Sequence, residues 1–205
     1  MRAGRHPRDR VVRRYLQLVV GLALFGFSLA VMVRAELGLP PWDVLHQGVA
    51  ERTPLTFGTV VIAFSILVML LWIPLRQRPG TGTVANALLV GVFVDVGLWL
   101  LPEVSHLGLR IAMLAGGIAL CGASTGLYVG AGLGPGPRDG LMTGLAARGI
   151  PLGAARVGIE LTALAIGWVL GGTVGVGTLA FALLIGPVVH WSVPRMRIDR
   201  PARTE

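Results

Sequence analysis

Two acidic residues, Asp43 and Asp139, hold matching places in the sequence and are the first candidates for chemistry. Each lies two residues after a proline, Pro41 or Pro137, and the two motifs are 96 positions apart. Proline suits the first turn of a helix, where no amide donor is lost. A carboxylate in that turn faces the positive end of the helix dipole. The pattern predicts two short helices, at 41–52 and 137–148, each with an acid at its start.

Two interpretations of these short helices stay open. Twelve helical residues span about 18 Å, too short to cross a hydrocarbon core of about 30 Å. Each segment is then either an amphipathic helix at the membrane surface or a re-entrant half-helix whose tip lines a site. Interrupted segments at matching places in two halves of a chain are typical of transporter binding sites.

Further charges lie near these motifs or inside an apolar run. Arg156 and Glu160 are four residues apart, so they share one helix face. A charge at the centre of a membrane helix costs about 2.5–3.5 kcal/mol, so such residues are expected to pair or to function. We predict that a substrate path is lined by Asp43, Arg138, Asp139, Arg156 and Glu160.

The chain that must position these residues reads as an all-α membrane protein. Hydrophobic residues make up 54% of its 205 residues and charged residues only 14%. Long apolar runs can cross a bilayer only as helices, because the backbone must satisfy its own hydrogen bonds there. Six spans are predicted, at 15–33, 57–75, 83–101, 109–130, 153–171 and 175–193.

The spans form two similar halves. Gly21 matches Gly117 at a spacing of 96, and Gly91 matches Gly186 at a spacing of 95. Each half has three spans, an odd number, so tandem copies must lie upside down relative to each other. We therefore expect two inverted three-helix repeats, at 15–102 and 103–193, between a basic arm at 1–14 and a basic tail at 194–205.

Charge predicts the orientation. All 18 basic residues are arginine, and 15 of them fall on one side if the N-terminus is cytoplasmic. This positive-inside bias predicts cytoplasmic N- and C-termini. The net charge of +8 lies at the ends of apolar runs rather than on one face, which argues against a nucleic-acid partner.

Small residues recur on the fourth span and indicate close helix packing. Two partners fit this pattern: the Gly26/Ala30 face of the first span, or a second copy in a homodimer. We expect the first, given the duplication. The predicted packing residues are Gly122, Gly126, Gly130 and Gly134.

Other chemistry is not indicated. The glycine-rich run at 130–137 lacks the lysine of a phosphate loop and follows no strand. The four histidines are scattered and Cys121 is the only cysteine, so no metal-ligand spacing is present. With no pairing of a nucleophile and a base, we expect no enzyme activity and no cofactor.

Several motifs together resemble the bacterial YczE/YyaS/YitT-type integral membrane proteins. They are Gly-Leu-Pro-Pro-Trp-Asp at 38–43, Gly-Pro-Gly-Pro-Arg-Asp-Gly at 134–140, the pair Arg156 and Glu160, and the glycine-rich run at 171–178. The resemblance covers 15–193 and implies a protein of the bacterial inner membrane. Some members of that group are associated with production of secreted lipopeptide antibiotics.

We expect a small-molecule transporter or exporter with its site between the repeats. The alternative is a non-transporting scaffold or regulator of a membrane-associated biosynthetic or secretion system. The expected partners are the lipid bilayer, a small-molecule substrate, and either a second copy or another membrane protein.

Overall fold

Six helical segments are long and apolar enough to cross a membrane, among residues 7–198, the part of the chain that the computed structural model describes. This part contains no strand. Two short helices, α2 (Pro41–Ala50) and α7 (Pro137–Ala146), follow the first and fourth segments. The spanning helices are α1 (Pro7–Ala35), α3 (Phe57–Leu70) continued by α4 (Trp72–Leu75), α5 (Thr81–Leu100), α6 (Leu107–Gly130), α8 (Leu152–Val169) and α9 (Val176–Met196).

Most helix ends lie within three residues of the predicted ones, and two features differ more. The first helix begins at Pro7, so 7–14 of the expected basic arm are helical, while 1–6 and 199–205 lie outside the described residues. The second span is interrupted at Leu71, between α3 and α4. Pro74 has no amide hydrogen to donate to the carbonyl four residues earlier, so a regular helix cannot continue there.

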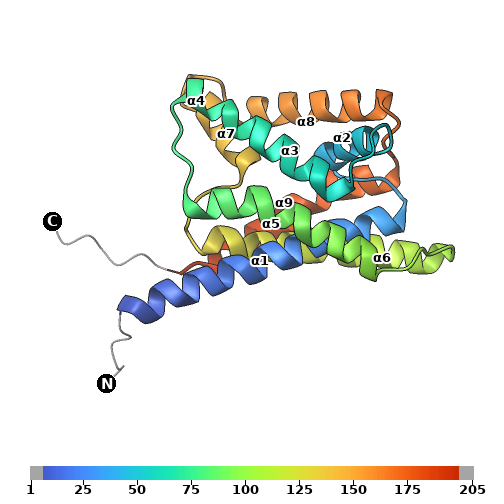
Figure 1. Cartoon of the computed structure of the whole chain (residues 1–205), viewed down its shortest axis with the longest axis horizontal. Coiled ribbons are helices and arrows are strands. Elements are labelled where there is room, and N and C mark those ends of the chain that lie inside the picture. The colour runs from blue at the N-terminus through green and yellow to red at the C-terminus, as the bar shows by residue number, and fades with distance from the viewer. Residues whose placement is uncertain (1–6, 199–205) are drawn as a thin grey trace.

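Helices α1 and α6 lie side by side and run in opposite directions, along the lower edge of the molecule in Figure 1. Their backbones approach closely at glycines. A Cβ on Gly21 would lie 2.7 Å from the backbone nitrogen of Tyr128, and one on Gly117 would lie 2.6 Å from the Met32 side chain. Large apolar side chains such as Trp168 face outward, at 67% exposure, where a bilayer would cover them.

Helices α1 and α6 each pack against one further helix. Helix α5 packs on α1 near Gly26, whose Cβ would meet Phe93, and α9 packs on α6 near Gly122, whose Cβ would meet Val188. The expected partner of the glycine face of α6 was the Gly26/Ala30 face of α1, and this was wrong. The face lies against α9, where Gly122, Gly126 and Gly130 meet Val188, Ser192 and Met196.

Two arginines tie α1 and α6 together at opposite ends. Arg14 on α1 donates to the carbonyl oxygens of Ala131 and Gly132, both at 2.6 Å. Arg110 on α6 donates to Ala35 at 2.7 Å and to Glu36 at 2.6 Å. The donor and both acceptors of one contact lie 96 positions from their counterparts in the other. Each guanidinium therefore covers the negative end of the other helix.

The loops that lead into α2 and α7 are held in the same reciprocal way. The amide of Gly82 donates to Leu133 at 2.9 Å, and the amide of Gly177 donates to Leu37 at 2.7 Å. Gly134, at φ 133°, lies in the loop before α7 rather than on the glycine face of α6. Such a φ favours glycine, so this residue positions the entry to α7.

Candidate functional site

The first turns of α2 and α7 meet at one cavity of about 360 Å³. Pro41 and Pro137 begin the two helices, which leaves Asp43 and Asp139 as the acids of the first turns. Helix α8 contributes two further charged side chains. The cavity therefore brings together the whole predicted path, namely Asp43, Arg138, Asp139, Arg156 and Glu160.

Residues from both halves line this cavity in matching pairs. Beside the two acids, Val90 of α5 and Ile185 of α9 face it, at a spacing of 95. The charged residues of α8 correspond to neutral ones of α3 at that same spacing. Val61 is the counterpart of Arg156 in the repeat, and Ser65 is the counterpart of Glu160. The two halves thus build one wall each, with different chemistry.

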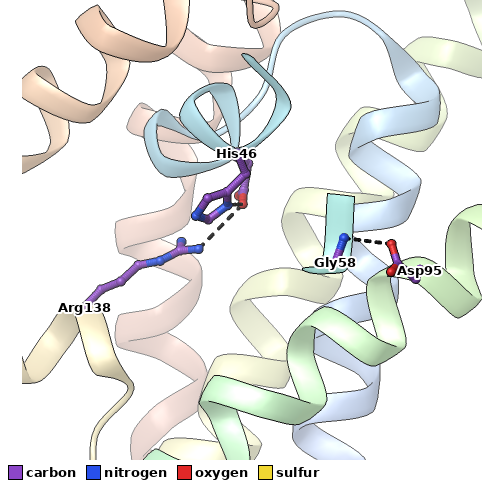
Figure 2. Close-up of polar contacts among 5 residues, drawn as sticks. His46, Gly58, Asp95 and Arg138 are labelled. Atoms are coloured by element: carbon purple, nitrogen blue, oxygen red, sulfur yellow. Dashed lines mark hydrogen bonds and ion pairs between the residues drawn. The ribbon is translucent and has the colours of Figure 1, made fainter. Parts of the chain in front are cut away.

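Asp43 is fully enclosed and holds an ion pair. Its Oδ1 lies 3.0 Å from Nδ1 of His46 and 3.7 Å from Nη2 of Arg138. Dashed lines mark these contacts at His46 and Arg138 in Figure 2. The Arg138 guanidinium also lies 5.1 Å from the Trp42 ring centroid, a cation–π contact. Burial alone would raise the pKa of Asp43, but the hydrogen bond from His46 and the charge of Arg138 outweigh it and lower that pKa.

His46 supports Asp43 as a neutral ring. Its side chain is buried, and that burial lowers the pKa of His46, although Asp43 pulls it upward. A neutral imidazole can donate from Nδ1 to the carboxylate. Nε2 of His46 and Oδ2 of Asp43 have no hydrogen-bond partner among the described residues. The pair is therefore fixed by one strong contact rather than by a full network.

Asp139 has a different environment from Asp43. Its Oδ2 lies 3.4 Å from the hydroxyl of Tyr128, and no cationic side chain of the described residues lies within ion-pair distance of it. Asp139 is exposed at the cavity surface, but the protein around it displaces water, and this desolvation raises the pKa of Asp139 against the opposing charges of Arg138 and Arg156. Of the two first-turn acids, Asp139 is therefore the one that more readily holds a proton.

Arg156 and Glu160 form the second ion pair of the cavity. Nε of Arg156 lies 3.0 Å from Oε1 of Glu160, as their spacing on one helix face predicts. Their side chains are 54% and 31% exposed. The pair thus lies at the open side of the cavity, away from the enclosed pair at Asp43.

One seam beside the cavity is closed. Helices α3 and α5 touch at Gly58 and Gly91, where a methyl group on either glycine would overlap the backbone oxygen of the other. Oδ1 of Asp95 accepts from the amide of Gly58 at 2.7 Å (Figure 2), and its Oδ2 accepts from the hydroxyl of Thr56 at 2.5 Å. Asp95 thus holds the start of α3 against α5.

The corresponding seam of the second half is open. A Cβ on Gly153 or Gly186, the counterparts of the two touching glycines, would meet no heavy atom within 4 Å. His190 stands in the place of Asp95 and lines the cavity instead. Over the described part of the chain, α8 and α9 make no contact comparable to that of α3 and α5. The cavity extends between them.

Residues 12–194 match a family described as "Family of unknown function (DUF6198)". The chain belongs to this family. An uncharacterised protein of Haemophilus influenzae is 37% identical over 85% of this chain and 80% of its own length. No solved structure matches.

Two relatives in Bacillus subtilis agree with the resemblance found in the motifs. The uncharacterised membrane protein YczE is 33% identical, over 92% of this chain and 89% of its own length. The uncharacterised protein YyaS is 24% identical, over 88% and 92%. With the six apolar helices, this DUF6198 chain is a YczE-like membrane protein with several spans.

Some residues of the site escaped the sequence analysis. His46 lies three residues after Asp43 on one helix face, and this spacing was a signal for their contact. Tyr128 lies beside Asp139, but a lone tyrosine in an apolar run carries no distinctive spacing. Asn86 and Trp42, which also line the cavity, were not assigned to it. No group of three metal-binding side chains was found among the described residues of this DUF6198 chain.

Proposed function

We propose that this protein is a small-molecule transporter of the bacterial inner membrane, built from two inverted three-span repeats around one cavity. One observation carries the proposal: two equivalent seams border the cavity, and one is closed while the other is open. A static scaffold has no need of such a difference between its halves. A carrier does, because it must expose its site to one side of the membrane at a time.

The inverted arrangement is supported by the reciprocal contacts. Arg14 and Arg110 cap each other's helices in opposite directions. Two further arginines make matching contacts: Arg52 donates to the carbonyl oxygen of Val169 at 3.4 Å, and Arg148 donates to that of Pro74. These contacts recur at spacings of 95 or 96 positions.

The re-entrant interpretation of α2 and α7 is supported by the depth of their first turns. The same cavity is lined by Phe25, in the middle of the spanning part of α1, and by Val90, in the middle of α5. Backbone that ends at this depth is tolerated where it lines a cavity. In this proposal one short helix enters from each side, and both N-termini meet the substrate.

The mechanism is an exchange between the two seams. In one state α3 and α5 are closed and the cavity opens between α8 and α9. In the other state Gly153 and Gly186 would come together and Gly58 and Gly91 would separate. The charged side chains of the cavity would hold the substrate while the halves rock, and no chemical conversion is part of this role.

Spin labels at matched positions test this exchange. Leu55 and Val96 flank the closed seam, and their counterparts Ile150 and Trp191 flank the open one, with exposures of 42–56% for all four side chains. Each pair would be labelled in a Cys121→Ala background, and distances would be measured in liposomes by double electron–electron resonance. We expect two distances at each pair, with the short distance dominant at one pair when the long one dominates at the other.

A single distance at both pairs, unchanged by pH or by ion gradients, would contradict a carrier. That outcome would favour the scaffold role, for which one conformation suffices. Comparing metabolites inside and outside cells of a deletion strain would then show altered output without any change in a compound's distribution.

A further inference from the structure

The charges on the cavity wall are nearly balanced, and the imbalance lies at one residue. Two ion pairs join four of the five charged side chains of the predicted path: Asp43 with Arg138, and Arg156 with Glu160. Asp139 is left over, with a tyrosine hydroxyl as its neighbour. If it is ionised, the wall carries one uncompensated negative charge.

Other titratable groups around Asp139 complete this account. Arg138 precedes it on α7, and its guanidinium lies against Asp43 and Trp42 rather than against Asp139. Helices α3 and α4 contribute no charged side chain, and the acid of α5, Asp95, is bound at the closed seam. The remaining groups nearby are Tyr128 and Cys121 on α6, His46 on α2, Arg156 and Glu160 on α8, and His190 on α9.

The helix dipoles do not alter the balance. An N-terminus attracts an anion, and two of them meet at this cavity. Each already has its own carboxylate in the first turn, Asp43 on α2 and Asp139 on α7. The site therefore lacks a positive charge rather than a negative one.

We propose that Asp139 is a binding site for which a proton and a singly charged organic cation compete. This inference rests on the proposed transport function and names its substrate class and coupling ion. Either occupant supplies the one positive charge that the wall lacks.

The remainder of the cavity suits an apolar or aromatic body beside that charge. Tyr128 packs edge-on against Phe25, with ring centroids 5.6 Å apart, and Trp42 and Phe181 add two more rings. Aromatic faces attract cations. The volume of about 360 Å³ is at the lower end of the range for small-ligand pockets, about 300–1,000 Å³.

The exchange conserves charge. In the resting site Asp139 carries its proton on a carboxyl oxygen. As the cation enters, the O–H bond breaks, the proton leaves to water, and the carboxylate pairs with the cation. Desolvation by the surrounding cavity wall, which raises the pKa of Asp139, favours the protonated form until the cation arrives.

Three probes with a similar body but different charge test the inference: benzyltrimethylammonium, phenylacetate and benzyl alcohol. Binding to the full-length protein in lipid nanodiscs would be measured by calorimetry in buffers of different ionisation enthalpy, which reports the protons released. We expect only benzyltrimethylammonium to bind, with release of up to one proton. Below the pKa of Asp139, its affinity should fall about tenfold per pH unit.

Variants separate the role of Asp139 from a structural one. Asp139→Asn resembles the protonated acid in shape and charge, so the protein should fold. This variant should lose proton release and pH dependence and bind the cation at least tenfold more weakly. Asp139→Glu should keep both the proton release and the pH dependence. The control is Glu103→Gln, which removes an acid whose side chain is 85% exposed and outside the cavity.

Three results would overturn the inference: preferential binding of phenylacetate, cation binding whose proton release and affinity do not change with pH, or no cation binding at any pH. None of them touches the proposed transport function, because the spin-label distances test that separately. Conversely, cation binding with proton release but a single distance at each seam would leave a binding site without a carrier.

Discussion

At the scale of single residues, Asp43 and Asp139 hold one position in two similar motifs but differ in chemistry. Asp43 is 1% exposed and contacts both His46 and Arg138. Asp139 faces the cavity beside a tyrosine hydroxyl. Environments that push two pKa values apart divide roles between like groups. In the proposal above, Asp139 is the one of the two acids that exchanges its proton.

The buried His46 gives a prediction about pH. Because burial lowers the pKa of His46 in the folded protein, the unfolded chain binds the proton at higher pH. This group's contribution to the free energy of unfolding should therefore fall by up to about 1.4 kcal/mol per pH unit below pH ~6.5. The measurement is the difference in unfolding free energy between wild type and His46→Gln across that range. A difference independent of pH would contradict a buried neutral ring.

A second prediction concerns Gly140, which lies under the ring of Trp72. The indole Nε1 of Trp72 donates to the Pro137 carbonyl at 3.0 Å, and the buried ring covers Gly140 so closely that a Cβ would overlap it. We expect Gly140→Ala to lower the free energy of unfolding by about 1–3 kcal/mol. The matched control is Gly116→Ala, where a Cβ meets nothing within 4 Å. Equal melting temperatures of the two variants would refute this packing.

At the scale of elements, the two seams respond to the same substitution in different ways. In the structure described, Gly91 touches Gly58, whereas Gly186 touches nothing. Gly91→Ala should force α3 away from α5 and lengthen the distance between labels at Leu55 and Val96. Gly186→Ala should leave that distance unchanged or increase the population with the short Leu55–Val96 distance, since the added methyl group hinders closure of the α8–α9 seam. A lengthening in both variants would contradict the assignment of open and closed seams.

The reciprocal arginines give an element-scale prediction with an internal comparison. Arg14 and Arg110 each donate to two carbonyl oxygens at the end of the facing helix. Hydrogen bonds to charged groups contribute about 1.5–3 kcal/mol. Arg14→Ala and Arg110→Ala should therefore lower the free energy of unfolding by similar amounts. The exposed Arg78 serves as the control, and its alanine variant should unfold like wild type.

At the scale of the whole molecule, the positive-inside bias and the count of spans predict sidedness. With a cytoplasmic N-terminus, position 78 lies in the cytoplasm and position 103 outside it. A membrane-impermeant maleimide should label Glu103→Cys in spheroplasts and Arg78→Cys only in inverted vesicles, both in a Cys121→Ala background. The reverse pattern would place the termini outside.

The two ends of the described chain lie at the same end of the molecule in Figure 1, as an even number of spans requires. The halves are nevertheless not identical in the structure, because the α3–α5 seam is closed and the α8–α9 seam is open. That difference is a property of the whole assembly of helices and not of any one of them.

The sequence by itself determined the elements of this protein. Hydropathy and proline placement are local properties, so the six spans and the short helices Pro41–Ala50 and Pro137–Ala146 could be predicted close to their observed ends. Spacing along one helix also predicted the contact between Arg156 and Glu160. Asp43 and Asp139 were found from the repeated proline motif, and Arg156 and Glu160 because charge within apolar runs is unusual.

Only the tertiary structure decided which partners those elements have. The glycine face of α6 could pack on any nearby helix, and its meeting with α9 depends on where the second half places that helix. Asp43 and Asp139 open similar motifs, and the sequence itself distinguishes them by His46, which lies three residues after Asp43 where Met142 follows Asp139. Only the fold places Arg138 beside Asp43 and Tyr128 beside Asp139. The physical reason is that burial and electrostatics are set by neighbours in space, whereas the duplicated sequence specifies only neighbours along the chain.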